Sequence, residues 1–130
     1  LEGKEGIKMM AEIVEDLDFG EEYYELADVP AMFNVLNPED LAEYRQALKS
    51  KKVQVNAIAL GEPVTEKPDN VRRVILDQKQ YKSFGANLIV SGNKVFAVSF
   101  TGNMYAVYIE NSNIAETVKM LFNLVENSKL

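Results

Sequence analysis

The residues best suited to chemistry gather in residues 81–100, YKSFGANLIVSGNKVFAVSF, which predict two strands joined by a tight, glycine-containing turn. Just before the first strand, Tyr81, Lys82 and Ser83 offer an aromatic ring, an amine and a hydroxyl. Ligand sites usually form on loops at strand ends, so these three side chains are candidate ligand-binding residues. The same residues can instead form a packed connection between two elements.

Two polar side chains, Asn87 and Ser99, lie inside strands that we expect to be buried. Buried polar groups need hydrogen-bond partners. A bound ligand would supply them, and so would a neighbouring side chain or a water molecule. Asn87 and Ser99 are therefore candidate ligand-binding residues with a structural alternative.

Arg72 and Arg73 lie in an extended segment, residues 71–76. Side chains alternate across a strand, so at most one of the two arginines faces a given cleft. An arginine in a cleft suits a phosphate or carboxylate ligand, because its guanidinium can bind two oxygens at once. The alternative is a solvated surface pair that balances an acidic chain.

The 130-residue chain contains no histidine and no cysteine. Their absence excludes disulfides, Ser-His and Cys-His nucleophiles, a histidine general base and zinc sites built on these side chains. An enzyme would have to use carboxylates or Lys82, which is the least favoured hypothesis, and we expect no metal and no cofactor. The net charge of −6 disfavours long-range attraction to nucleic acid or anionic lipid.

The length of 130 residues fits a single domain. Every apolar run is shorter than the roughly 18 residues that a membrane helix needs, and the N-terminus has no uninterrupted apolar signal core. The first residue is Leu1 and not Met, so we expect either a piece of a longer protein or a processed product. The lack of cysteine fits a cytoplasmic location, which is what we expect.

Hydrophobic periodicity and turn residues predict an α/β domain with a mixed central β-sheet and helices on both faces. The expected helices are residues 6–17, 31–36 and 113–126 and one after an N-cap at Asn37, and the expected strands are residues 23–27, 53–60, 71–76, 86–90, 95–100 and 104–109. The order strand, helix, strand predicts a parallel βαβ unit. The strand at 95–100 is apolar at all but one position, so we expect it to lie centrally with helices on either side.

The last predicted helix carries two sets of apolar side chains. The expected buried stripe, at helical spacing, is Ile114, Val118, Leu121 and Val125. A second set lies partly outside that stripe: Met120, Phe122 and Leu124. This second set is either ordinary core or a surface for a partner chain, and its members are our candidate dimer-interface residues.

Four stretches carry a family resemblance: LEGKEGIKMMAEIVED at the N-terminus, VRRVI at residues 71–75, LIVSGNKVFAVSF at residues 88–100 and YAVYIENSNIAETVKMLFNLVEN at residues 105–127. In their order and spacing they resemble the C-terminal regulatory domain of TrmB-type transcriptional regulators. That domain is similar to one half of the phospholipase D fold, whose active members carry a His-x-Lys motif and an aspartate on a comparable hairpin. The matching positions here are Gly85, Ala86 and Asn87, followed by Ser91, Gly92 and Asn93. The resemblance therefore implies a phospholipase D-like domain without that catalytic chemistry.

In the same family an N-terminal winged helix-turn-helix domain binds DNA, and this sequence contains neither that domain nor its coiled coil. The resemblance implies a domain that senses an effector, dimerises, or both, and so changes how two DNA-binding domains are spaced. The expected partners are a second copy and a small sugar or anionic metabolite, with DNA bound only through the missing domain and no membrane. The alternatives are a purely structural dimerisation module with a degenerate cleft and the carboxylate- or lysine-based enzyme.

Overall fold

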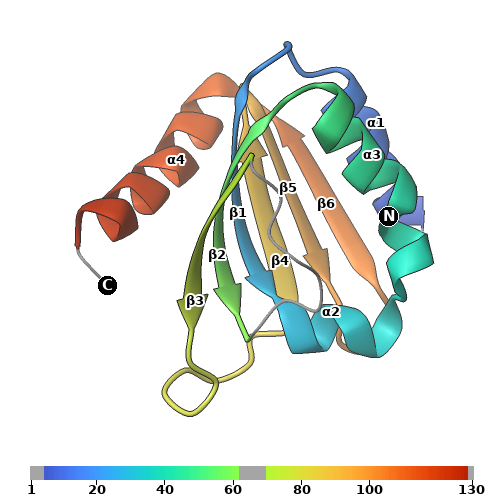
Figure 1. Ribbon diagram of the computed structural model, residues 1–130, viewed down its shortest axis with the longest axis vertical. Coiled ribbons are helices and arrows are strands. Elements are labelled where there is room, and N and C mark those ends of the chain that lie inside the picture. The colour runs from blue at the N-terminus through green and yellow to red at the C-terminus, as the bar shows by residue number, and fades with distance from the viewer. Residues whose placement is uncertain (1–4, 62–69, 129–130) are drawn as a thin grey trace.

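A six-stranded mixed sheet organises the chain in a computed structural model that describes residues 5–61 and 70–128 (Figure 1). Its strands are β1 (Glu22–Asp28), β2 (Gln54–Leu60), β3 (Val71–Leu76), β4 (Ala86–Ser91), β5 (Lys94–Ser99) and β6 (Tyr105–Glu110), in the spatial order β3-β2-β1-β4-β5-β6. Strands β1, β2 and β3 run parallel, and β4, β5 and β6 form an antiparallel meander. The predicted α/β class with a mixed sheet is confirmed.

The helices are α1 (Glu5–Glu15), α2 (Val29–Val35), α3 (Ala42–Ser50) and α4 (Ser112–Asn127), with a 3-10 turn, η1 (Pro38–Leu41), before α3. Asn37 caps this turn as predicted, because its side chain accepts from the backbone of Asp40 while the Asp40 carboxylate accepts from the backbone of Asn37. Asn111 caps α4 by accepting a hydrogen bond from Ile114 N. No helix within the described residues is both long and apolar enough to cross a lipid bilayer.

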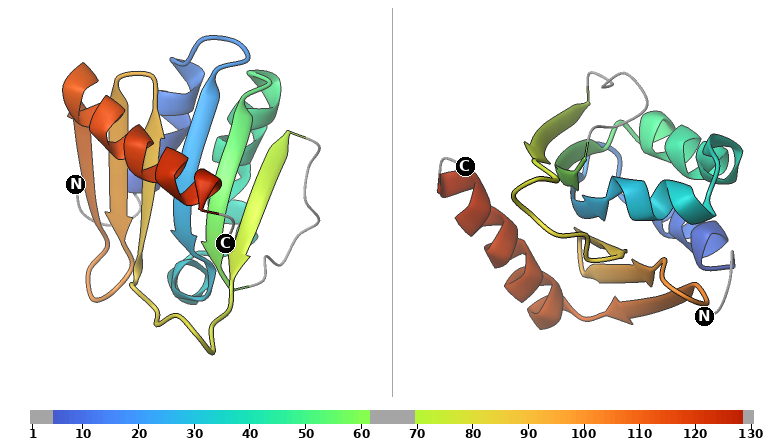
Figure 2. Two further views of the ribbon diagram at one scale, coloured as in Figure 1. Left: turned by 90° about the vertical axis from the view of Figure 1, so that its left-hand side faces the viewer. Right: turned by 90° about the horizontal axis from the view of Figure 1, so that it is seen from below.

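Helices cover the two faces of the sheet unequally (Figure 2). Helices α1 and α3 pack on one face and α2 lies at its end, over a core that includes Val14, Tyr23 and Phe96; we call this the α1/α3 face. Helix α4 alone lies diagonally across the other face, the α4 face, over Ile58 and Val90. One helix is narrower than six strands, so the α4 face is only partly covered.

The parallel pairing predicted for residues 23–27 and 53–60 is confirmed, since β1 and β2 pair in parallel. Strand β5 is covered on both faces as expected, because Val95 packs with α4 and Phe96 packs with the α1/α3 core. Its predicted central place is wrong: β1 and β4 occupy the centre, and β6 lies outside β5. A strand with apolar residues on both faces must be covered on both sides. A strand next to the edge of the sheet can be covered in this way as well as a central one.

The predicted orientation of α4 is wrong in part. Phe122 is only 5% exposed and its ring lies 5.6 Å from that of Tyr24, centroid to centroid, whereas Leu121 is 58% exposed. Ala115 and Phe122 are buried and Val118 packs beside them, so the helix is rotated relative to the predicted stripe. Phe122 is therefore core and is not available to a partner chain. The other two interface candidates, Met120 and Leu124, are exposed, as is Ile114 from the predicted inner stripe.

This orientation predicts losses of stability of very different size for truncations at two adjacent positions of α4. Phe122→Ala should lower the free energy of unfolding by about 3 kcal/mol, because it leaves a cavity against the sheet. Leu121→Ala should lower it by less than about 1 kcal/mol, because the side chain is mostly in solvent. Urea unfolding of both variants, at a concentration where the chain is monomeric, measures the difference. Equal losses, or a larger loss for Leu121→Ala, would contradict the observed orientation of α4.

Candidate functional site

Asp28, at the carboxyl end of β1, is fully buried, and its carboxylate accepts hydrogen bonds from two segments, the first turn of α2 and residues 83–85. Its Oδ2 accepts from Ser83 Oγ and from the backbone N–H groups of Phe84 at 2.9 Å and Gly85 at 2.8 Å. Its Oδ1 accepts from Ala31 N at 3.1 Å and so caps α2. Burial alone raises the pKa of Asp28, but these four donors outweigh it and hold the pKa below its usual value.

Asn87 completes this group, which we call the Asp28 cluster. Its Oδ1 accepts from Asp28 N at 3.0 Å, and its Nδ2 contacts the sulfur of Met32 at 3.4 Å. The structure therefore brings the predicted residues Ser83 and Asn87 together, but around a carboxylate of the chain itself. For Asn87 the structural alternative from the sequence is the one observed, a neighbouring protein group as partner.

Sequence reasoning missed Asp28, which directly follows the strand predicted at residues 23–27. A local signal was present, because an aspartate two residues before Pro30 is a typical N-cap with proline in the first turn. The other donors come from residues 83–85, more than 50 positions further along the chain. No local pattern indicates that distant contact.

Removing the Asp28 carboxylate should strongly lower the free energy of unfolding. Asp28→Ala leaves buried N–H groups and a hydroxyl without their acceptor, so we expect the free energy of unfolding to fall by about 3 kcal/mol or more. The matched control is Asp77→Ala, because exposed Asp77 accepts one backbone bond, from Lys79 N at 2.9 Å, and should cost about 1 kcal/mol at most. Urea unfolding at pH 7 measures both, and equal costs would contradict the role of the Asp28 cluster.

The remaining predicted ligand residues do not converge on one site. Asn87 pairs with Val98, whereas Ser99 pairs with Ala86, so Asn87 and Ser99 lie on opposite faces of the sheet. Ser99 lies within 3.4 Å of the hydroxyl of Thr101. The four remaining predicted ligand residues are exposed or half-exposed: Arg72, Arg73, Tyr81 and Lys82.

The two arginines of β3 alternate as predicted, and Arg73 is the one on the α1/α3 face. Ala57 pairs with Glu25 on one side and with Arg73 on the other, so the three residues form a row across β1, β2 and β3. Ala57 is small, which leaves space above it for the longer side chains on either side. Glu25 belongs to the face of β1 that also carries the core residue Tyr23.

Glu25 is a half-buried carboxylate in an otherwise apolar layer. Burial raises its pKa from 4.5 to about 7, although the charges of Arg73 and Arg45 act in the opposite direction. In the described part of the chain it forms no hydrogen bond and no ion pair. Beside it, the hydroxyls of Tyr23 and Tyr44 share a hydrogen bond, and burial raises the pKa of both tyrosines well above the usual value. We call these five residues the Glu25 cluster.

The raised pKa makes stability depend on pH. Because the folded-state pKa exceeds the unfolded one, the protonated carboxyl stabilises the fold below pH 4.5, and this contribution is lost as pH rises through about 7. The difference is at most about 3 kcal/mol at pH 8. We therefore expect Glu25→Gln to raise the free energy of unfolding by up to about 3 kcal/mol at pH 8 and hardly at all at pH 4.5.

Urea unfolding at the two pH values measures this effect. Glu12→Gln, an exposed substitution on α1, is the matched control and should change stability by less than about 0.5 kcal/mol at either pH. A loss of stability in Glu25→Gln at pH 8 would show that the ionised carboxylate has partners that stabilise it.

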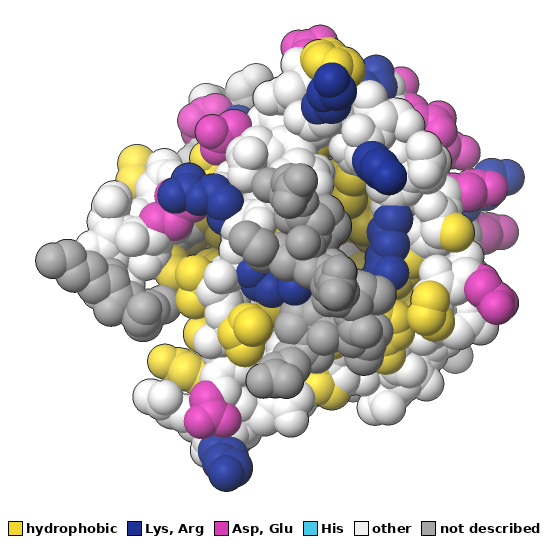
Figure 3. All heavy atoms as spheres, viewed as in Figure 1, with side chains coloured by type: hydrophobic (Ala, Val, Ile, Leu, Met, Phe, Trp, Pro, Cys, Tyr) yellow, Lys and Arg dark blue, Asp and Glu magenta, His cyan; other side chains and the backbone are white. Residues whose placement is uncertain are grey.

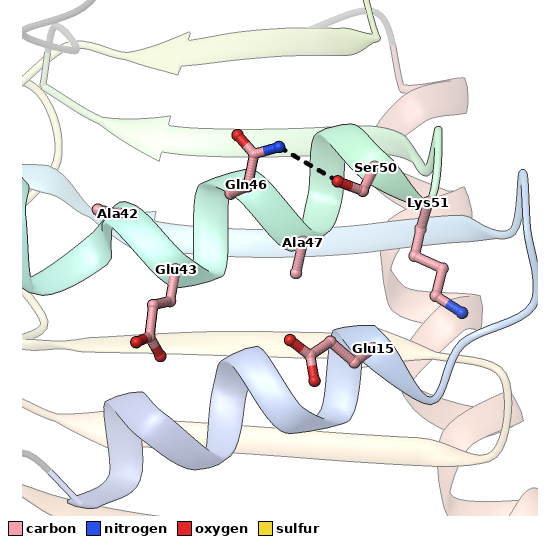
Figure 4. A pocket seen from close by; sticks show the side chains of 7 residues that line it. All are labelled: Glu15, Ala42, Glu43, Gln46, Ala47, Ser50 and Lys51. Atoms are coloured by element: carbon pink, nitrogen blue, oxygen red, sulfur yellow. Dashed lines mark hydrogen bonds between the residues drawn. The ribbon is translucent and has the colours of Figure 1, made fainter.

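Two surface grooves lie elsewhere, between α1 and α3 (Figure 4). The larger has a volume of about 510 Å³ and is lined by Glu15, Ala42, Glu43, Gln46, Ala47, Ser50 and Lys51. Its carboxylates come from both helices, and Gln46 is tied to Ser50 by a hydrogen bond of 3.2 Å. Neither this groove nor its neighbour around Tyr44 contains a residue that the sequence predicted for ligand binding. Both grooves are open to solvent.

Comparison with protein-family models, with curated proteins and with solved structures finds no match to this chain. The family resemblance thus rests on the four sequence stretches alone. The functional argument rests on the geometry of the described residues.

Proposed function

We propose that this domain is the effector-sensing and dimerisation module of a TrmB-like transcriptional regulator, with a phospholipase D-like fold that acts by binding and not by catalysis. The observation that carries the dimerisation part is the outer surface of α4. Ile114, Met120, Leu121 and Leu124 are exposed there, around the half of the helix that does not touch the sheet. Exposed apolar patches of this kind mark interaction surfaces.

A second copy of the chain is the occupant that suits this surface best. The exposed apolar arc of α4 contains no charged residue, so two copies can meet across it without charge repulsion. The charged residues Glu116 and Lys119 lie on another side of the helix and pair with each other at 3.2 Å. The adjoining part of the sheet adds exposed Val107, which can extend the contact.

The effector-sensing part is supported by the Glu25 cluster. It places a carboxyl, two guanidinium groups and two phenols close together on a partly accessible face, which suits an anionic or polyhydroxylated small molecule. The Asp28 cluster favours the second candidate, a purely structural dimerisation module. Its donors already satisfy Asp28 where a ligand was expected, at the carboxyl ends of the strands.

The dimer is tested by a charge on α4. We expect the unaltered domain to be a dimer, and Leu124→Glu to weaken it roughly 100-fold, because each copy would then bury an unpaired carboxylate of like charge. Asn123→Glu, on the polar side of the same helix, should remain dimeric. Sedimentation equilibrium measures both. A monomeric unaltered domain, or equal behaviour of the two variants, would contradict this interface.

Effector sensing is tested separately, by thermal shift against sugars, sugar phosphates, nucleotides and small carboxylates. A ligand at 100 times its dissociation constant adds about 2.7 kcal/mol, which is several degrees for a domain of this size. A specific shift supports a sensor. A dimer that no compound stabilises supports the structural module instead.

A further inference from the structure

The Glu25 cluster combines two guanidinium groups with a single carboxyl. Arg73 reaches it from β3 and Arg45 from α3, and both act electrostatically on the one carboxyl of Glu25. Within the described residues, β2 and β4 place the uncharged Ala57 and Ile89 beside Glu25, and Tyr23 and Tyr44 are neutral phenols. Tyr44 also lines the groove that contains Lys8, Asp40 and Glu43. Figure 3 shows that several Lys and Arg side chains lie among hydrophobic ones on the side of the molecule that Figure 1 presents.

The guanidinium groups are not neutralised by Glu25. Among residues 5–61 and 70–128, neither Arg45 nor Arg73 forms an ion pair with it or with any other carboxylate. Both arginines are only half-buried, so their donors remain accessible from solvent. Accessible, unpaired guanidinium groups suit oxyanions, since each can donate two parallel hydrogen bonds.

We infer that Arg73 and Arg45 bind an oxyanion, the phosphate, sulfate or carboxylate group of a small effector, and that Glu25 must take up a proton for this anion to bind well. The inference deepens the proposed effector-sensing function and rests on it. An ionised Glu25 would repel the anion and compete for the two arginines. A protonated Glu25 removes that negative charge and can donate its own O–H to an anion oxygen. Anion binding and proton uptake then favour each other.

The direction of the coupling between anion binding and proton uptake follows from the protonation of Glu25 in the anion-free protein. The pKa of Glu25 near 7 means that about nine-tenths of the molecules carry the proton at pH 6 and about one-tenth at pH 8. If the protonated form is the one that binds, the apparent dissociation constant is the intrinsic value divided by that fraction. Affinity should therefore fall about tenfold between pH 6 and pH 8.

Sulfate is the probe for this test, because its own charge does not change over this range, whereas phosphate titrates near pH 7. Amide chemical shifts of the ¹⁵N-labelled domain are followed during sulfate titration at pH 6 and pH 8, at constant ionic strength. We expect saturable shifts centred on residues 44–46 and 71–75, with about tenfold weaker binding at pH 8. Glu25→Gln should bind at both pH values as the unaltered protein binds at pH 6.

The chain offers a matched pair of controls in its two adjacent arginines. Arg73→Gln should abolish the shifts at both pH values, whereas Arg72→Gln, on the opposite face of β3, should leave them unchanged. Thermal melting of each variant verifies that it is folded. Saturable shifts that survive Arg73→Gln, or the absence of shifts at pH 6, would overturn the anion site. Equal affinity at the two pH values, or a pH dependence that persists in Glu25→Gln, would overturn the role of the proton.

A failure of this anion site can be distinguished from a failure of the proposed effector-sensing function. A compound from the thermal-shift panel that still stabilises Arg73→Gln would leave the sensor in place and remove this site from it. A compound that stabilises the unaltered domain but not Arg73→Gln, and does so more at pH 6 than at pH 8, would support both.

Discussion

The buried carboxylate of Asp28 is the constraint on which the arrangement of the sheet depends. Burying an ionised carboxylate costs several kcal/mol unless hydrogen bonds replace the water it loses. Asp28 obtains them from the first turn of α2 and from residues 83–85, and its own N–H is bonded to Asn87. These contacts fix β1 beside β4, which is the one place where the parallel and antiparallel halves of the sheet meet. The same satisfied donors leave little at the strand ends for a ligand to bind.

A second consequence of the topology is the difference between the two faces. The parallel half requires crossovers, and α2 and α3 run between β1 and β2 on the same face as α1. The antiparallel strands are joined by tight turns, so the opposite face receives only the C-terminal helix. A helix that covers a sheet alone has one side on the sheet and the rest in solvent. The apolar residues on that outer side are therefore a surface left by the fold itself.

Sequence alone predicted the strands, the cap at Asn37 and the mixed sheet, because these depend on local periodicity and turn chemistry. It failed for α4, since Ile114 and Leu121 are as apolar as Val118 and Phe122, and a stripe this wide does not indicate which side faces the sheet. It failed for the strand ends because Asp28 binds donors more than 50 residues away. Asn87 and Ser99 were grouped although strand pairing places them on opposite faces, and that pairing depends on where the β4–β5 turn begins.

Two carboxylates three residues apart on β1 show why polar satisfaction matters more than burial alone. Asp28 is fully buried, yet its four donors keep its pKa low. Glu25 is less buried but has no hydrogen bond from a described residue, and its pKa rises to about 7. The first carboxylate stabilises the fold in its ionised form, whereas the second destabilises it in that form. The fold is therefore more stable when Glu25 is protonated. An anion bound by Arg45 and Arg73 would favour that protonated form.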